Sequence, residues 1–141
     1  MANINPYVNF MGNTEEAFNF YKSVFGGEFL ALSRFGDTPH GDNMPANEKD
    51  KIMHISLPIG NTILMGTDAL ESQGHTLTFG NNFSIGITPD SMDEAHQIFD
   101  GLSAGGNVDV PLQKMFWGAW FGMFSDKFGI KWMINYDDSQ K

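Results

Sequence analysis

The strongest constraint on the fold is a helical pattern that occurs twice in the chain. The first copy runs from Asn13 to about Phe25 and the second begins at Ser91, and the two superpose without a gap. Each begins with a residue that can cap a helix, and a glutamate follows three positions later, where its carboxylate can reach free amides of the first turn. Each copy ends at paired glycines, which suit the left-handed conformation that ends helices. One buried stripe is predicted at Ala17, Phe20, Tyr21 and Val24, and the matching stripe at Ala95, Ile98, Phe99 and Leu102.

Strand-like segments surround both helices, one before each helix and three after it. The predicted strands are residues 4–10, 28–35, 52–59 and 62–66 around the first helix, and 83–88, 108–116, 119–124 and 131–136 around the second. In the strands that precede the helices, the apolar side chains should face the helix. These are Val8 and Phe10 in the first, and Phe83, Ile85 and Ile87 in the second.

The order of these elements predicts an α+β fold with two βαβββ modules in a single domain. The first module is expected at residues 1–68 and the second at 81–141, joined by a linker at 69–80. Residues 36–51 and 67–82 do not fit the strand plan and are predicted to be loops, because they are polar and rich in turn-forming residues. The first loop is either a lid beside a binding site or a surface insertion.

Charge and composition exclude several kinds of partner. A chain of 141 residues, 41% of them hydrophobic, can bury a real core. No run approaches the roughly 18 apolar residues that cross a bilayer, and residues 1–6 lack the features of a secretory signal. With no cysteines for disulfides, a cytoplasmic protein is expected. The formal charge of -9 would repel nucleic acid and anionic membranes.

The repeated unit resembles the vicinal-oxygen-chelate (glyoxalase-like) superfamily, and within it the PhnB-like branch. The segments that carry the resemblance are NPYVNF at 5–10, EAFNFY at 16–21, Phe116-Trp117, and DKFGIKWMIN at 126–135. The resemblance implies a cupped sheet with the helices on its outer face and a small-molecule site in the cup. The branch has the historical label 3-demethylubiquinone-9 3-methyltransferase domain. The chain shows no Gly-rich loop after a first strand that would bind a methyl donor.

In metal-using members of that superfamily, His and Glu side chains on inner strand faces form an open coordination site. The positions that match here are Asn5 or Pro6, then His54, Ser84 and Met133. Of these only His54 is a strong ligand for zinc or a similar ion, because thioethers, hydroxyls and amides hold such ions weakly. No metal site of the glyoxalase type and no cofactor are therefore expected.

His54 is the candidate catalytic residue. In the strand at 52–59 one face is predicted to carry Met53, Ile55, Leu57 and Ile59, which leaves His54 and Ser56 on the other. An imidazole there could act as an acid or base at cellular pH. The alternative is a partly buried histidine satisfied by a polar neighbour. The remaining histidines, His40, His75 and His96, are predicted to be surface residues.

Aromatic and methionine side chains crowd the two strands near 115–124, more than one face of a small sheet needs. They can line the cup, form a subunit interface or fill the core. The candidate ligand-binding residues are Asn9, Ser56, Ser84, Gln113, Trp117 and Met133. A symmetric homodimer is expected, partly by analogy with the superfamily.

Three functions fit these observations. The first is a metal-free protein that binds a small apolar or aromatic ligand. The second is a lyase, isomerase or dioxygenase that uses His54 as a general base or in a rearranged metal site. The third is a structural or regulatory partner protein. The residues alone do not decide whether the chain is an enzyme.

Overall fold

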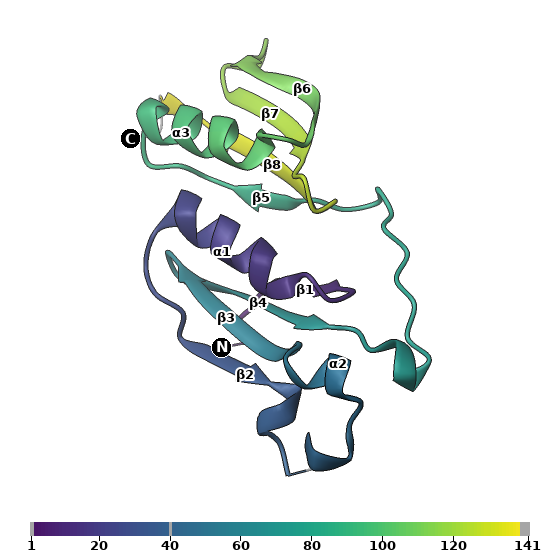
Figure 1. The fold of residues 1–141 in the computed structure, drawn as a ribbon. Coiled ribbons are helices and arrows are strands. Elements are labelled where there is room, and N and C mark those ends of the chain that lie inside the picture. The colour runs from purple at the N-terminus through teal and green to yellow at the C-terminus, as the bar shows by residue number, and fades with distance from the viewer. Residues whose placement is uncertain (1, 40, 139–141) are drawn as a thin grey trace. The chain divides into compact units, whose positions relative to one another are not determined.

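The computed structural model describes residues 2–39 and 41–138, which form two units with the same plan (Figure 1). The first unit is Met1–Thr78 and the second is Phe79–Lys141. Each has one long helix packed on one face of a four-stranded sheet. The predicted α+β fold with two βαβββ modules is therefore confirmed.

The elements of the first unit are β1 (Tyr7–Phe10), α1 (Thr14–Phe25), β2 (Ala31–Arg34), β3 (Ile52–Ile59) and β4 (Thr62–Asp68). Those of the second are β5 (Ile85–Ile87), α3 (Met92–Ser103), β6 (Asn107–Lys114), β7 (Trp120–Ser125) and β8 (Lys131–Tyr136). The strand orders are β1-β4-β3-β2 and β5-β8-β7-β6. In each sheet the strand before the helix pairs in parallel with the last strand, and the other pairs are antiparallel.

The two long helices begin in different ways. The predicted cap of α3 is confirmed, since the Ser91 hydroxyl accepts a hydrogen bond from the Glu94 amide at 3.1 Å. Asn13 occupies the N-cap position of α1, as predicted, but its side chain makes no capping hydrogen bond. The carboxylate of Asp68, at the end of β4, accepts the Thr14 amide instead. A remote carboxylate thus replaces the local cap.

The buried stripes also differ between the helices. That of α3 is confirmed at all four predicted positions. In α1 the buried residues are Thr14, Ala17, Phe18 and Tyr21. Phe20 and Val24 are only half-buried. Gly66 explains the burial of Phe18, because a Cβ on Gly66 would lie 2.6 Å from the Phe18 ring.

Two strand predictions need correction. The pairing of β2 with β3 shifts register between Ser33 and Arg34, so Ile52 is buried and Met53 is exposed. Met53 therefore does not share the buried face of Ile55 and Leu57. Phe83 lies before β5 and is 74% exposed, because β5 pairs with β8 only from Ile85 to Ile87.

The segment between β2 and β3 is not simply a loop. It contains two 3-10 turns, Phe35–Asp37 and Gly41–Asn43, and the short helix α2 (Ala46–Lys49). Glu48 of α2 is buried, and its carboxylate accepts hydrogen bonds from the hydroxyl and amide of Ser72. A further 3-10 turn, Glu71–Gln73, lies in the other predicted loop. His40 lies outside the described residues.

No helix in the described part of the chain is both long and apolar enough to cross a membrane.

Candidate functional site

In the first unit, α1 packs against β3 and β4, and no helix among the described residues of this unit covers the opposite face of the sheet. Val8, Ile55 and Leu64 are buried on the α1 side, so strand alternation and register assign their neighbours to the other side. This first helix-free face consists of Tyr7, Asn9, Ala31, Ser33, His54, Ser56, Pro58, Ile63, Met65 and Thr67. None of these residues is Asp, Glu, Lys or Arg.

His54 is half-buried on this face, where its ring lies beside that of Tyr7. The ring centroids are 6.2 Å apart, and the planes are inclined by 36°. No hydrogen bond joins the His54 imidazole to another group within residues 2–39 and 41–138. The role of His54 as an acid, a base or a ligand contact stays a prediction.

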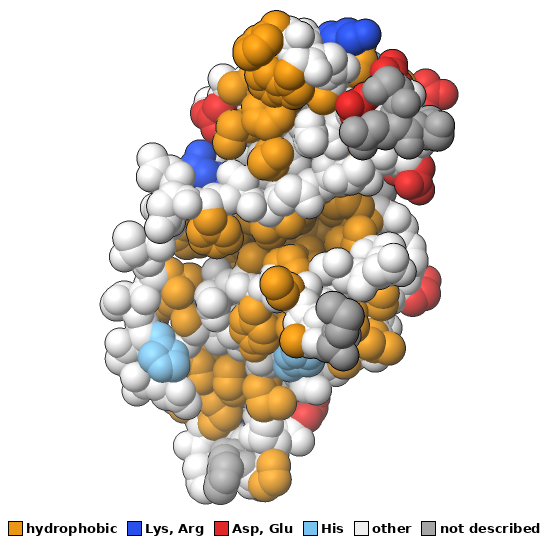
Figure 2. Space-filling view, turned by 180° about the vertical axis from the view of Figure 1, so that it is seen from behind, with side chains coloured by type: hydrophobic (Ala, Val, Ile, Leu, Met, Phe, Trp, Pro, Cys, Tyr) orange, Lys and Arg blue, Asp and Glu red, His pale blue; other side chains and the backbone are white. Residues whose placement is uncertain are grey.

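Two other predicted ligand-binding residues share this face with His54. Ser56 is 3% exposed, two residues from His54 on the same strand, and Asn9 is exposed on β1. The sequence did not identify Tyr7 as a candidate site residue. Its alternation with Val8 and Phe10 nevertheless places Tyr7 on the same face of the strand as Asn9. Figure 2 shows hydrophobic and histidine side chains at the surface of the first unit.

The second unit has a helix-free face of its own. Trp132 and Ile134 are buried on the side that α3 covers, so Met133 and Asn135 lie on the opposite side. The register then gives this second helix-free face as Gly86, Asn107, Val110, Gln113, Phe121, Met123, Ser125, Lys131, Met133 and Asn135. Of the predicted residues, Gln113 and Met133 lie on this face, and Ser84 comes just before β5.

The aromatic residues of the β6–β7 hairpin have several environments. Trp117, at the turn of the hairpin, packs edge-to-face on Phe121 with ring centroids 6.1 Å apart. Phe124 is fully buried against Phe99 of α3. Phe116 is 97% exposed. The crowding that the sequence shows is therefore divided among the core, the second helix-free face and the surface.

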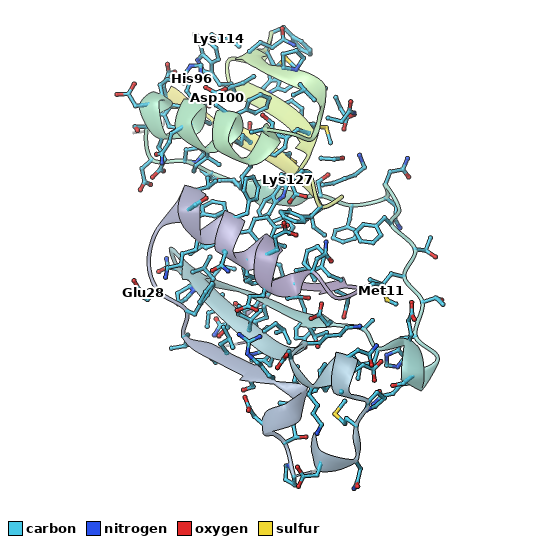
Figure 3. All side chains as sticks on the ribbon, in the orientation of Figure 1. Met11, Glu28, His96, Asp100, Lys114 and Lys127 are labelled. Atoms are coloured by element: carbon cyan, nitrogen blue, oxygen red, sulfur yellow. The ribbon has the colours of Figure 1, made fainter. Side chains whose placement is uncertain are left out.

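The surface prediction for two histidines is confirmed. His75 and His96 are exposed. Figure 3 shows His96 and Asp100 along α3, which covers the opposite face of the sheet from Gln113 and Met133. His96 contacts Trp120, with ring centroids 6.2 Å apart.

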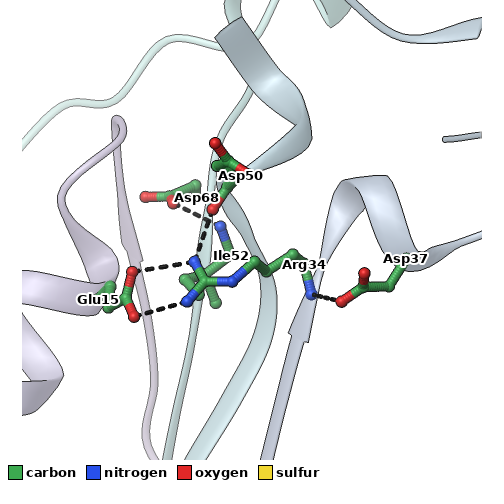
Figure 4. A network of polar contacts seen from close by, with 6 residues as sticks. All are labelled: Glu15, Arg34, Asp37, Asp50, Ile52 and Asp68. Atoms are coloured by element: carbon green, nitrogen blue, oxygen red, sulfur yellow. Dashed lines mark hydrogen bonds and ion pairs between the residues drawn. The ribbon is translucent and has the colours of Figure 1, made fainter. Parts of the chain in front are cut away.

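A network of charged groups lies on the α1 side of the first sheet (Figure 4). The Arg34 guanidinium donates to both carboxylate oxygens of Glu15, at 2.9 and 2.7 Å, and to the Asp50 carbonyl at 2.8 Å. The bonds from Arg34 lower the pKa of Glu15, and the same carboxylate raises the pKa of Arg34. The network joins α1 to β2 and to the end of the segment before β3, so its role is structural.

The match to known proteins spans nearly the whole chain. The family model of the glyoxalase/bleomycin resistance protein/dioxygenase superfamily matches residues 3–134. The chain belongs to this superfamily. Its relative YjdN of Escherichia coli K12 is 30% identical over 140 residues, which cover 94% of this chain and 93% of YjdN.

Two solved structures are similar to this superfamily member. Protein PA1353 of Pseudomonas aeruginosa is 41% identical, with a TM-score of 0.85 over 97% of this chain and 98% of PA1353. The PhnB protein of Bacillus cereus, also named as a 3-demethylubiquinone-9 3-methyltransferase, is 26% identical. Its TM-score is 0.77 over 96% of this chain and 99% of that protein.

At the positions that match the superfamily's metal ligands, the chain has neutral side chains and one imidazole. The side-chain oxygen Oδ1 of Asn5 accepts a hydrogen bond from the Ile63 amide at 3.0 Å, and the backbone carbonyl of Pro6 accepts one from the Met65 amide. His54 is the one strong ligand of the set, because Ser84 and Met133 offer a hydroxyl and a thioether. Within the described residues, no three His, Asp or Glu side chains are grouped so that they could hold a metal ion.

Proposed function

We propose that this member of the superfamily binds an uncharged organic molecule on its helix-free faces, without a divalent metal of the glyoxalase type. The observation that carries the proposal is the neutrality of the first helix-free face. The chain has 17 acidic and 8 basic side chains, but none of those that the structure describes belongs to that face. A surface without fixed charge favours ligands without charge, because an ion would lose hydration and gain no partner.

The mixture of side chains on this face suits an aromatic ligand with a few polar groups. Ile63 and Met65 offer apolar contact, and the tilted Tyr7–His54 pair offers aromatic contact. Asn9 can orient a polar group of the ligand by hydrogen bonding. In this account His54 acts as a hydrogen-bonding partner of the ligand.

A thermal-shift screen of small aromatic compounds, run with a chelator present, tests the proposal. Each uncharged compound is paired with a carboxylate or ammonium analogue of the same ring. Uncharged compounds should raise the melting temperature of the folded chain more than their charged analogues do. A response that requires an added divalent ion, or that only charged compounds give, would contradict the proposal.

Variants locate the binding. His54→Ala should reduce the shift caused by an active compound, while His75→Ala, which removes an exposed histidine, should leave it unchanged. Nuclear magnetic resonance of the histidine side chains provides a second measurement, because the His54 signals should move when the compound is added. Equal effects of the two variants would place binding away from His54.

A further inference from the structure

Three side chains form a row across the second helix-free face, one from each of three adjacent strands. Phe121 of β7 lies between Gln113 of β6 and Asn135 of β8. Adjacent strands are about 5 Å apart, so the backbones that carry the two amides are separated by roughly 10 Å. We call these three residues the amide–aromatic row.

Both amides of the row are available for hydrogen bonding. Gln113 and Asn135 are exposed, and their side chains make no hydrogen bond within residues 2–39 and 41–138. Other side-chain amides already have partners within the chain. The side-chain nitrogen of Asn107 donates to the Asp109 carboxylate, and the side-chain oxygen of Asn5 accepts from the Ile63 backbone amide. A side-chain amide carries both donors and an acceptor, so each end of the row can bind a hydroxyl or a carbonyl group.

The surroundings of the row are apolar. Next to the row on the same face, Met123 of β7 lies opposite Met133 of β8. Trp117 packs edge-to-face on Phe121, the central residue of the row. The cation of this face, Lys131, is bonded to Asp109 at 3.3 Å and to the Ser125 hydroxyl at 3.2 Å. Its charge is therefore already paired.

We propose that the amide–aromatic row binds an uncharged ligand of two fused aromatic rings with a hydrogen-bonding group at each end. The rings contact Phe121 and Trp117, and the two end groups bond to Gln113 and Asn135. This inference rests on the proposed function and specifies the ligand of its second face. Aromatic side chains on a sheet also stack nucleic-acid bases, but the net charge of -9 opposes a phosphate backbone.

Three naphthalene compounds of the same ring size serve as probes for the full chain. The first is a naphthalenediol with its hydroxyl groups at opposite ends, the second is a naphthol with one hydroxyl group, and the third is the matching dicarboxylate. Their intrinsic fluorescence reports binding. The diol should bind more tightly than the naphthol, and the dicarboxylate should bind more weakly than both.

Single substitutions test the row directly. Gln113→Ala and Asn135→Ala should each weaken diol binding about three- to tenfold, as expected for the loss of one hydrogen bond. The double variant Gln113→Ala/Asn135→Ala should bind the diol no more tightly than it binds the naphthol. Phe121→Leu should weaken binding of both compounds, and Asn19→Ala, which removes an exposed amide on α1, should change neither. Unchanged circular dichroism spectra show that the variants fold.

The outcomes separate this inference from the proposed function. Diol binding that falls in His54→Ala but not in the Gln113 and Asn135 variants overturns the inference and leaves the proposed function in place. Equal affinity for diol and dicarboxylate overturns the inference. Absence of binding to any of the three probes also overturns it, while the proposed function is judged by the wider compound screen.

Discussion

Asp68 connects three separate segments of the first unit through one buried carboxylate. One oxygen accepts the amides of Gly12 and Thr14 and the Thr14 hydroxyl, and the other accepts the Ile52 amide. The residue is 3% exposed. It therefore holds the start of α1 and the start of β3 at the end of β4.

Asp68→Ala should lower the free energy of unfolding by about 3 kcal/mol, because three buried or part-buried backbone amides lose their acceptor. Asp68→Asn should cost less, since it keeps one acceptor oxygen. Urea unfolding followed by circular dichroism measures both. Asp100→Ala, at an exposed position of α3, is the matched control and should change stability little. An equally small effect of Asp68→Ala would show that these hydrogen bonds are replaced by water.

The ion pair of Glu15 and Arg34 makes a smaller contribution that depends on pH. Because Arg34 lowers the pKa of Glu15 in the folded state, the pair stabilises the fold above the unfolded pKa of Glu15. This stability is lost as the pH falls from the unfolded pKa through the lower folded-state pKa of Glu15, where the carboxylate is protonated. Both side chains are about a third or more exposed, so the contribution should be under about 1 kcal/mol.

Glu15→Gln should therefore lower the urea midpoint at pH 7 and have little effect at pH 3. Glu16→Gln, at the adjacent exposed position, serves as the control and should match the wild type at both values. A difference between Glu15→Gln and the wild type that stays constant with pH would contradict the ion-pair explanation.

Single residues were predictable from the sequence where their environment is local. Ser91 and Glu94 cap a helix with groups three residues apart, so the pattern identified them. Asp68 caps α1 from 54 residues away, and no local pattern reveals such a bond. His54 and Ser56 could be placed on one face by alternation alone. Gln113 and Asn135 meet across Phe121 through the strand register, which the sequence does not supply.

At the scale of elements, α1 approaches its sheet closely because a glycine lies beneath a phenylalanine. A Cβ on Gly66 of β4 would lie 2.6 and 2.8 Å from two atoms of the Phe18 ring. Such contacts force the helix or the ring to move.

Gly66→Ala should lower the free energy of unfolding by about 1–3 kcal/mol through this overpacking. Gly86→Ala is the matched control in another strand, because its Cβ would meet only a Met133 carbon at 3.8 Å. The melting temperatures of the two variants measure the effect. Similar melting temperatures of the two variants would mean that α1 or the Phe18 ring moves aside without loss of stability.

The helices and strands themselves were largely predictable, because their periodic patterns are local. The strands Ile52–Ile59 and Lys131–Tyr136 have the predicted bounds. The strand before α3 is shorter than predicted, because its length is set by pairing with β8 and not by its own alternation. The short helix α2 escaped prediction because Glu48, its buried residue, is held by Ser72 from another segment.

At the scale of the whole molecule, apolar side chains that remain exposed favour self-association. Phe116 is 97% exposed next to Trp117, which is 53% exposed. Adjacent exposed aromatic residues are typical of interfaces. We expect a homodimer in solution, as the sequence predicts.

Light scattering after size-exclusion chromatography should therefore give a mass of about twice the 15.7 kDa of one chain. The mass should fall toward that of one chain on dilution if the dimer is weak. A mass of one chain over the whole concentration range would contradict self-association.

We propose that this member of the superfamily binds its ligand without the divalent metal of glyoxalase-type sites. The most direct test is elemental analysis of chain purified without chelator or metal-affinity resin, combined with melting temperatures in the presence of zinc, manganese, nickel and ferrous ions. We expect far less than one metal ion per chain and no rise in melting temperature. One metal ion per chain, with a rise in melting temperature that His54→Ala removes, would contradict it and indicate a metal centre built on His54.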